Sequence, residues 1–283
     1  MIFSPVKFYG RSFVEKTGGI WYNGTILFFG DEDMNEENTA AVHGFDTKRI
    51  QILSGSMLKL LALICMITDH FAATVIYRTD IGTEPLFTLG SRTITLYRIG
   101  RYIGRLAFPL YCFLIAEGFR HTHDKKRYGA MLLGFAVISE IPWNLWITGK
   151  FTCAKQNVFF TLFLGFMALY VFERFKDKTV YQLAALIGVF AAAILIKSDY
   201  GAKGVAFILL IHVLRENKTA AAFIGSFVLR HTLLMMAAFG IMAMYNGERG
   251  FIRGKAWKYF FYIIYPLHIF VLYLIRRHFF GYE

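Results

Sequence analysis

The sequence predicts an all-helical polytopic membrane protein with about eight or nine transmembrane helices, preceded by a small soluble segment. Of its 283 residues, 56% are hydrophobic and 18% are aromatic. The mean hydropathy of +0.46 is higher than soluble domains usually reach. Apolar runs recur from residue 57 to the end, and Lys, Arg, Gly or Asn bounds each run. Since a spanning helix needs about 20 apolar residues, these runs predict a multi-pass protein.

Eight segments qualify as candidate spans. They lie at residues 57–77, 97–119, 127–147, 157–173, 179–196, 200–214, 219–245 and 257–275. The seventh is long and carries Arg230 and His231 in its middle, so the alternative is two broken halves. That division would give the ninth helix.

The first 56 residues are predicted to be a separate unit, and residues 57–283 the membrane domain. The stretch GGIWYNGTILFFG places Asn-Gly between two short runs rich in β-formers, which indicates a hairpin. The acidic DEDMNEEN that follows is predicted to be loop. Ser54-Gly55-Ser56 is typical of a flexible joint, and Met57 could be a native start behind a fused extension. We assign residues 1–56 no function.

The formal charge of +12 argues for membrane lipids or an anionic ligand and against nucleic acid. The first 56 residues hold five basic and seven acidic residues, so the excess belongs to the membrane domain, where basic residues cluster at helix ends. Three cysteines cannot build a disulfide framework, and Cys65 and Cys112 lie inside predicted spans. The cysteines therefore give no evidence on redox environment.

Two polar residues on the first span suggest a chemical site. Lys59 and His70 are eleven residues apart, close to three whole helical turns, so they share one face about 16.5 Å apart. A surface cation with a deeper imidazole suits a thioester donor whose phosphates stay at the surface. A lysine that reaches the surface and a histidine bonded to a neighbouring helix explain the spacing equally well. Asp69 points about 100° from His70, so it is not automatically its partner.

A basic row opens the second span. Arg98, Arg101 and Arg105 fall at i, i+3 and i+7 and make one cationic face that enters the membrane. Interfacial anchoring explains Arg98 and, in part, Arg101. The deeper Arg105 needs an anion or a carboxylate, and Glu140 in ISEIPWNL is a candidate. An ion pair that only fixes helix packing is the alternative for Arg105 and Glu140.

Further polar residues lie near span ends. They are Asn157 before VFFTLFLG, Asp199 and Tyr200 before GVAFILLIHVL, and His268 in YPLH. Asn157 and Asp199 would each be explained by helix capping if considered alone. His268 follows a proline inside the last span and is harder to explain structurally.

Several motifs, in order, resemble the TraX family, whose namesake acetylates the amino terminus of F-type conjugative pilin. They are LKLLALICMITDH, RIGRYIGRLAFPLYCFLIAEGFRHT, ISEIPWNL, QNVFFTLFLG, SDYGAKGV and FYIIYPLHIFVLYLI, and they cover residues 57–276. TraX proteins are in turn similar to the broad superfamily of membrane acyltransferases, whose first helix carries a basic residue, ten intervening residues and a histidine. Lys59 and His70 match that pattern.

The resemblance implies acetyl-CoA as acyl donor, His70 as the catalytic residue, no metal, and a location in the bacterial cytoplasmic membrane. We expect His70 to act as general base, with a transient acyl-histidine as a variant. Asp69 or Glu140 would orient the imidazole, and Arg105, Asn157 or His268 would supply an oxyanion donor. Lys59, Arg98 and Arg101 are expected to hold the donor. The acceptor, a peptide, glycan or lipid, is expected to contact Asn157, Asp199, Tyr200 and His268.

Two other classes remain open. A proton-coupled transporter or channel would use the same buried Asp, His, Arg and Glu residues as an ion path. No internal repeat of the kind seen in many transporters is evident. In a helical scaffold these residues would only pair helices, and His70→Ala would affect stability alone.

Overall fold

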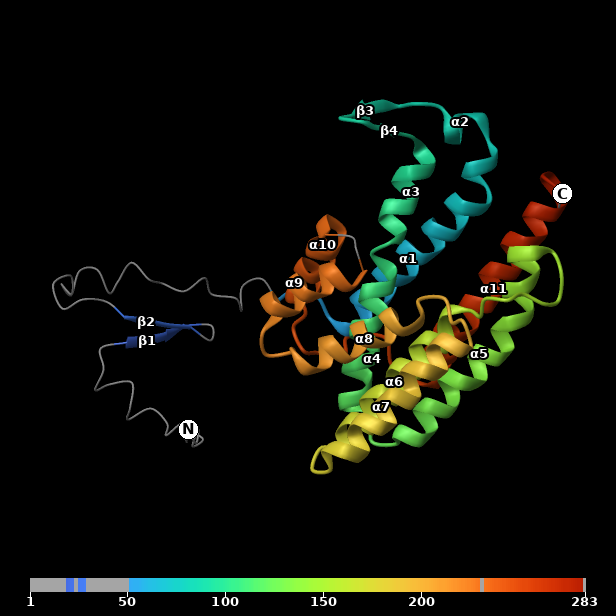
Figure 1. The fold of residues 1–283 in the computed structure, drawn as a ribbon. Coiled ribbons are helices and arrows are strands. Elements are labelled where there is room, and N and C mark those ends of the chain that lie inside the picture. The colour runs from blue at the N-terminus through green and yellow to red at the C-terminus, as the bar shows by residue number, and fades with distance from the viewer. Residues whose placement is uncertain (1–18, 23–24, 29–50, 230–231, 282–283) are drawn as a thin grey trace. The chain divides into compact units, whose positions relative to one another are not determined.

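The computed structural model describes residues 19–22, 25–28, 51–229 and 232–281. The chain divides into two compact units, Met1–Arg49 and Ile50–Glu283. In the first unit, β1 (Gly19–Tyr22) pairs antiparallel with β2 (Thr25–Phe28), and Tyr22 lies opposite Thr25 (Figure 1). The predicted hairpin is confirmed. The acidic segment predicted to be loop lies outside the described residues.

The second unit is built from helices, as predicted. Its main helices are α1 (Gly55–Thr74), α3 (Leu96–Gly104), α4 (Ala107–His121), α5 (Lys125–Thr148), α6 (Val158–Arg174), α7 (Thr179–Leu195), α8 (Gly201–Val213), α9 (Lys218–Leu229), α10 (Thr232–Ala243) and α11 (Lys255–Phe279). Within the described residues, four helical segments are long and apolar enough to cross a membrane: Gly55–Arg78, Leu96–His121, Lys125–Thr148 and Tyr259–Phe279. The helices of residues 179–195, 201–213, 219–229 and 233–243 are shorter and apolar.

Helix α1 begins at Gly55, two residues before the predicted span. Ser54 caps it by accepting from the Met57 amide at 3.4 Å. The Gly55 amide donates to the Glu248 carbonyl at 2.8 Å, and the Ser56 hydroxyl donates to the Arg249 carbonyl at 2.8 Å. The residues predicted to be a flexible joint are therefore bonded to the loop that precedes α11.

The second predicted span is broken into α3 and α4 at Arg105 and Leu106. Pro109 explains the position of the break, because a proline has no N–H to donate to the carbonyl four residues earlier, which is that of Arg105. The Leu106 amide instead donates to the Ile103 carbonyl at 3.1 Å, in a tighter turn. The arginines of the predicted basic row therefore do not all belong to one regular helix.

The seventh predicted span takes the divided form. Helices α9 and α10 have 12 residues each, or about 18 Å, which is shorter than a bilayer core of about 30 Å. They pack against each other, with α9 also on α8 and α10 also on α4 (Figure 1). After α10 the chain returns to the start of α1, where the Leu53 amide donates to the Met244 carbonyl at 2.9 Å.

Small elements that we did not predict connect α1 to α3. They are the 3-10 turn η3 (Ile76–Arg78), the single-turn α2 (Asp80–Thr83), and the antiparallel strands β3 (Phe87–Leu89) and β4 (Arg92–Ile94). The turn between the strands uses Gly90 at φ +60°.

The core of the helical unit lies among α1, α4, α5, α6, α8 and α11. Its largest fully buried side chains include Phe119, Phe166 and Phe207. Close helix approach depends on glycine at several points, and at Gly165 an added Cβ would overlap Ile208 of α8. The helices therefore pack with their backbones close together, as is typical of membrane bundles.

Candidate active site

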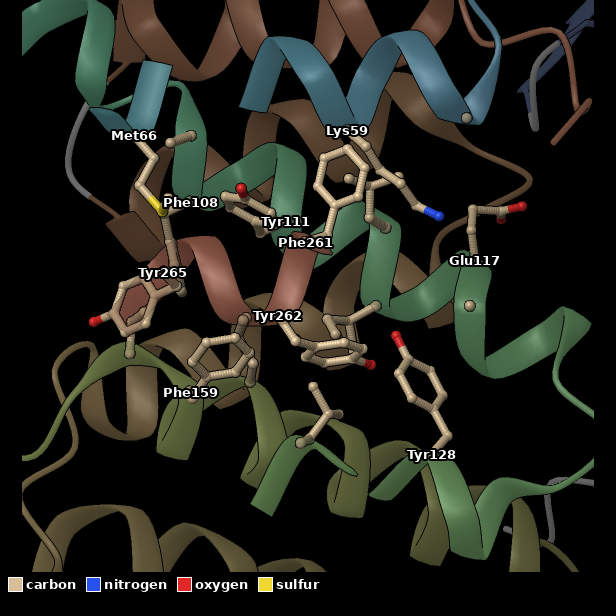
Figure 2. A pocket seen from close by; sticks show the side chains of 18 of the residues that line it. Lys59, Met66, Phe108, Tyr111, Glu117, Tyr128, Phe159, Phe261, Tyr262 and Tyr265 are labelled. Carbon is tan, nitrogen blue, oxygen red and sulfur yellow. The ribbon is translucent and has the colours of Figure 1, made fainter. Parts of the chain in front are cut away.

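A large cavity lies inside the helical unit, with walls from α1, α4, α5, α6 and α11. Its volume is about 1140 Å³, slightly above the range of about 300 to 1,000 Å³ for small-molecule sites. Aromatic residues form much of the wall: Phe108, Tyr111, Tyr128, Phe159, Phe261, Tyr262 and Tyr265 (Figure 2). These rings give the cavity a partly apolar wall.

The two ends of this cavity differ chemically. Figure 2 shows Lys59 and Glu117 at one end and Met66 and Tyr265 at the other. Arg127 and Arg249 also line the cavity, together with the acidic Glu117 and Asp124, so its wall carries several charged groups of both signs. His70 lies near the Tyr265 end, with 6.4 Å between the two ring centroids. Lys59 and His70 thus line one cavity, as the helical spacing predicted, while their chemical roles stay predictions.

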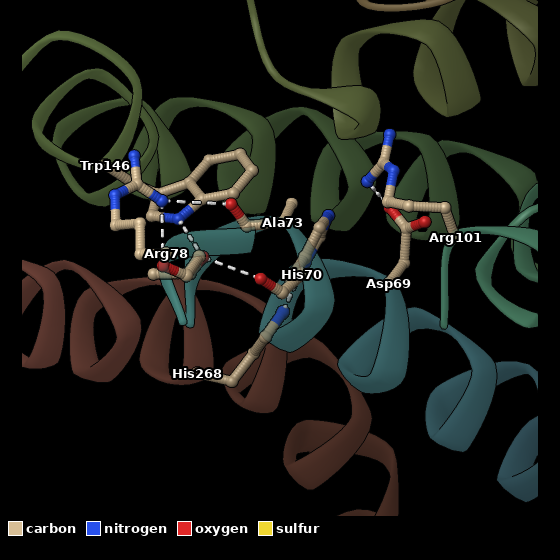
Figure 3. A network of polar contacts seen from close by, with 8 residues as sticks. Asp69, His70, Ala73, Arg78, Arg101, Trp146 and His268 are labelled. Carbon is tan, nitrogen blue, oxygen red and sulfur yellow. Dashed lines mark hydrogen bonds and ion pairs between the residues drawn. The ribbon is translucent and has the colours of Figure 1, made fainter. Parts of the chain in front are cut away.

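His70 is hydrogen bonded to His268 of α11. His70 Nδ1 lies 2.7 Å from His268 Nε2, and the two rings are nearly parallel, with centroids 5.0 Å apart and 9° between their planes (Figure 3). His268 Nδ1 lies 2.8 Å from the Ile264 carbonyl, which can only accept. The pattern therefore assigns the protons of a neutral pair: His268 Nδ1–H donates to Ile264, and His70 Nδ1–H donates to His268 Nε2. His70 Nε2 then keeps its lone pair, and within the described part of the chain it makes no hydrogen bond.

Other contacts fix the backbone around His70. The Thr74 hydroxyl donates to the His70 carbonyl at 2.6 Å and accepts from Trp146 Nε1 at 2.8 Å. The centroids of the Trp146 indole and the His70 imidazole are 5.1 Å apart. Arg78 donates to the carbonyls of Ala73 and Thr74 (Figure 3). These contacts join the last turn of α1 to α5 and hold the imidazole between α5 and α11.

Asp69 faces a different helix. Its carboxylate accepts from Arg101 Nη1 of α3 at 2.6 Å, and in the described residues no hydrogen bond joins it to His70 (Figure 3). Gly100 and Gly104 permit the approach of α3, because an added Cβ would overlap Ala72 at the first position and Asp69 at the second. The partner of the imidazole is therefore His268, where we had expected Asp69 or Glu140.

The three arginines of the basic row have separate surroundings. Arg98 donates to the Thr93 carbonyl and does not line the large cavity, and Arg101 pairs with Asp69 and does line it. Arg105 lies over the ring of Tyr102 at 5.6 Å. Because of the helix break, they do not form the single row that we expected.

Glu140 and Asn157 bond to each other. Asn157 is fully buried, and its Oδ1 accepts from the Phe159 amide at 3.0 Å, which caps α6. Its Nδ2 donates to the Glu140 carboxylate and to the Ala136 carbonyl. Glu140 thus joins α5 to the start of α6, and within the described residues it makes no ion pair with Arg105. Neither Glu140 nor Asn157 lines the large cavity.

Asp199 and Tyr200 line the large cavity next to the start of α8. The Asp199 carboxylate pairs with Lys155 at 2.6 Å. The ring of Tyr200 stacks on Phe108, with centroids 3.4 Å apart and 1° between the planes. Sequence reasoning did not single out Lys155, Trp146 or Arg249. Lys155 lies in a loop, and Trp146 is one of several aromatic residues of α5, so the sequence around each gives no indication of a function.

This is a helical protein with segments long enough to span a membrane and a large cavity lined by His70. The family model described as TraX protein matches residues 54–276. Since that match covers most of the chain, the protein belongs to the TraX family, which confirms the resemblance seen in the sequence. A relative from Dichelobacter nodosus, "Probable fimbrial assembly protein FimC, serogroup H1", is 30% identical over 251 residues, covering 77% of this chain and 94% of the relative. No solved structure matches.

Proposed function

We propose that this protein is an acetyltransferase of the bacterial cytoplasmic membrane that moves an acetyl group from acetyl-CoA to an amine of a pilin-type subunit. Membership of the TraX family and the fimbrial name of the relative support this acceptor over a glycan or a lipid. The observation that carries the proposal is His70, which lines a cavity of about 1140 Å³ and is held by His268 with Nε2 unprotonated.

The reaction needs one general base and balances without any further reactant. The amine nitrogen attacks the thioester carbonyl carbon, and His70 Nε2 takes the proton that the nitrogen loses. The tetrahedral intermediate then breaks its carbon–sulfur bond. The proton passes from His70 to the sulfur, so the products are an amide and the thiol form of CoA. Direct attack by His70 to form an acyl-histidine is the variant.

His268 acts as a positioning residue in this scheme. By accepting from His70 Nδ1, it selects the tautomer whose Nε2 can serve as base. It does not line the large cavity, so it acts behind the imidazole. This replaces the acceptor-binding role that we first expected for His268.

The donor would lie along the cavity with its phosphates at the Lys59 end. Lys59 would supply a cation at that end, and Arg127 and Arg249, which line the same cavity, would supply two more. Lys59 and His70 are about 16.5 Å apart along α1, so a long thioester arm suits the gap between them. Arg98 does not line the cavity, so we no longer assign it to donor binding.

The end of the bundle where α1 begins would then face the cytoplasm. The loop before α11 bonds to this end and carries Arg249 and Arg253. Lys255 and Lys258 follow in the sequence of α11. Basic loops are retained on the cytoplasmic side, where acetyl-CoA is available.

Transfer of radiolabelled acetyl from acetyl-CoA by the purified protein tests the proposal. Membrane extract from piliated cells serves as acceptor, and folded His70→Ala is compared with the unchanged protein. We expect label in a pilin-sized band only with the unchanged protein. If the protein neither binds nor consumes acetyl-CoA, the proposal is wrong, and solute flux in liposomes would test the transporter class instead.

A further inference from the structure

A second cavity lies beside the first, next to the start of α8. Its volume is about 590 Å³. It shares with the large cavity the residues Asp69, Arg101, Gly104, Phe108, Asp199 and Tyr200. The remaining wall comes from Arg105, Pro109, Ser198, Gly201, Ala202, Lys203, Leu229 and Met235. The ion pair of Asp69 and the stacked pair of Phe108 and Tyr200 thus separate two chambers.

The wall of this second cavity carries excess positive charge. Its two carboxylates are already neutralised, since Asp69 pairs with Arg101 at 2.6 Å and Asp199 pairs with Lys155 at 2.6 Å. Arg105 and Lys203 remain, and neither takes part in an ion pair within the described part of the chain. Arg105 is half-buried, so its guanidinium is not fully hydrated. Arg105 lies within electrostatic reach of the Asp69 carboxylate, which already pairs with Arg101, so the wall keeps an excess of positive charge that favours an anionic ligand.

The backbone at this cavity also presents donors. Helix α8 has 13 residues, and its N-cap Tyr200 supplies no side-chain cap. The amides of the first helical turn have no acceptor within a helix, and they lie at the positive end of its dipole. Gly201, Ala202 and Lys203 of that turn all line the cavity. The Gly201 amide donates to the Ser198 carbonyl at 2.9 Å, which leaves the next amides for a ligand.

A buried hydroxyl without a partner lies in the same wall. Ser198 is 4% exposed and lines the cavity, and its Oγ has no hydrogen-bond partner in the described structure. A buried polar group without a partner costs about 1 to 3 kcal/mol, so such groups are usually satisfied by something bound. This observation does not depend on the helix terminus, and it indicates the same ligand position.

We propose that the second cavity binds a phosphate group, held by Arg105, Lys203, the Ser198 hydroxyl and the first amides of α8. A tetrahedral oxyanion with several acceptor oxygens matches a guanidinium fork, an ammonium, a hydroxyl and helix amides together. The phosphate is either soluble or the headgroup of an anionic lipid. The site is separate from the donor cavity, and the inference does not depend on acetyl transfer.

Inorganic phosphate is the first probe. Its binding to the purified protein in detergent is measured by calorimetry and by thermal unfolding, against chloride at equal ionic strength. We expect Arg105→Gln and Lys203→Gln each to weaken phosphate binding about tenfold, and Ser198→Ala to weaken it less. Lys126→Gln, an exposed cation at the start of α5, is the matched control and should bind as the unchanged protein does.

Phosphatidylglycerol tests the lipid source. Protein from phosphatidylglycerol nanodiscs is analysed by native mass spectrometry, and retention of that lipid is compared between the unchanged protein and Arg105→Gln. If Arg105→Gln no longer retains phosphatidylglycerol, the ligand is a lipid headgroup. If the variant loses only the binding of inorganic phosphate, the ligand is soluble. The inference is overturned if neither probe depends on Arg105 and Lys203, or if Lys59→Gln in the large cavity removes phosphate binding while Arg105→Gln does not.

Discussion

The two neighbouring residues Asp69 and His70 lie in different surroundings on α1. Asp69 pairs with Arg101 of α3, which follows α1 closely in the chain, whereas His70 bonds to His268 of α11, 198 residues away. The first contact joins a carboxylate to a guanidinium beside two glycines that let the helices approach. The second joins two imidazoles with hydrogen-bond roles that leave one nitrogen available. Adjacent polar residues in a membrane helix can therefore have partners on different helices, and the proposed chemistry uses only His70 of this pair.

The largest effect is expected for His70→Ala. Loss of the proposed general base should lower acetyl transfer by about 100- to 10,000-fold, with the protein still folded. Initial rates with radiolabelled acetyl-CoA measure this. His278, an exposed histidine in the last turn of α11 that does not line the cavity, provides the control His278→Ala, which should keep full activity. If the His70 variant were as active as the unchanged protein, His70 would not be the general base, and its face of α1 would not be the catalytic one.

His268→Ala should have the next largest effect. His70 would keep its imidazole but lose the acceptor that selects its tautomer, so kcat should fall on the order of 10- to 100-fold with little change in the KM for acetyl-CoA. His268→Gln should restore part of kcat, since its side-chain carbonyl can accept from His70 Nδ1–H. If the alanine and glutamine variants unfold earlier but retain kcat, His268 only supports packing.

Lys59→Gln tests donor binding at the other end of the α1 face that carries His70. Removing one cation from the proposed phosphate-binding end should raise the KM for acetyl-CoA about tenfold and leave kcat nearly unchanged. Steady-state kinetics separates the two parameters. A fall in kcat at unchanged KM would place Lys59 in the chemical step and contradict the arrangement of the donor.

The smallest effect is expected for Asp69→Asn, on the other face. The Asp69 and Arg101 side chains are 19% and 32% exposed, so their ion pair is partly screened. Its loss should lower the free energy of unfolding by about 1 to 2 kcal/mol, between the values of exposed and buried pairs. Thermal unfolding in detergent measures this. Loss of acetyl transfer at unchanged stability would show that Asp69 takes part in the reaction.

Several parts of the fold could be predicted because they depend on short stretches of chain. The spans follow from apolar length, since the backbone in lipid must satisfy its own hydrogen bonds and does so as helix. The Asn-Gly turn predicted the β1 and β2 hairpin. The division of the seventh span followed from two polar residues at its centre. The strands β3 and β4 were missed because each has only three residues.

The sequence by itself determined the helical class, the approximate positions of the helices, the family and the shared face of Lys59 and His70, because each depends on hydropathy, motif order or helical periodicity. The tertiary structure alone decided which partner each polar residue has. His268 bonds to His70, whereas we expected Asp69 or Glu140 to orient the imidazole. Glu140 bonds to Asn157, whereas we expected it to pair with Arg105. Which residues of different helices meet depends on how the helices pack and on the position of the break before Pro109. The periodicity of a single helix predicts neither the packing nor the break.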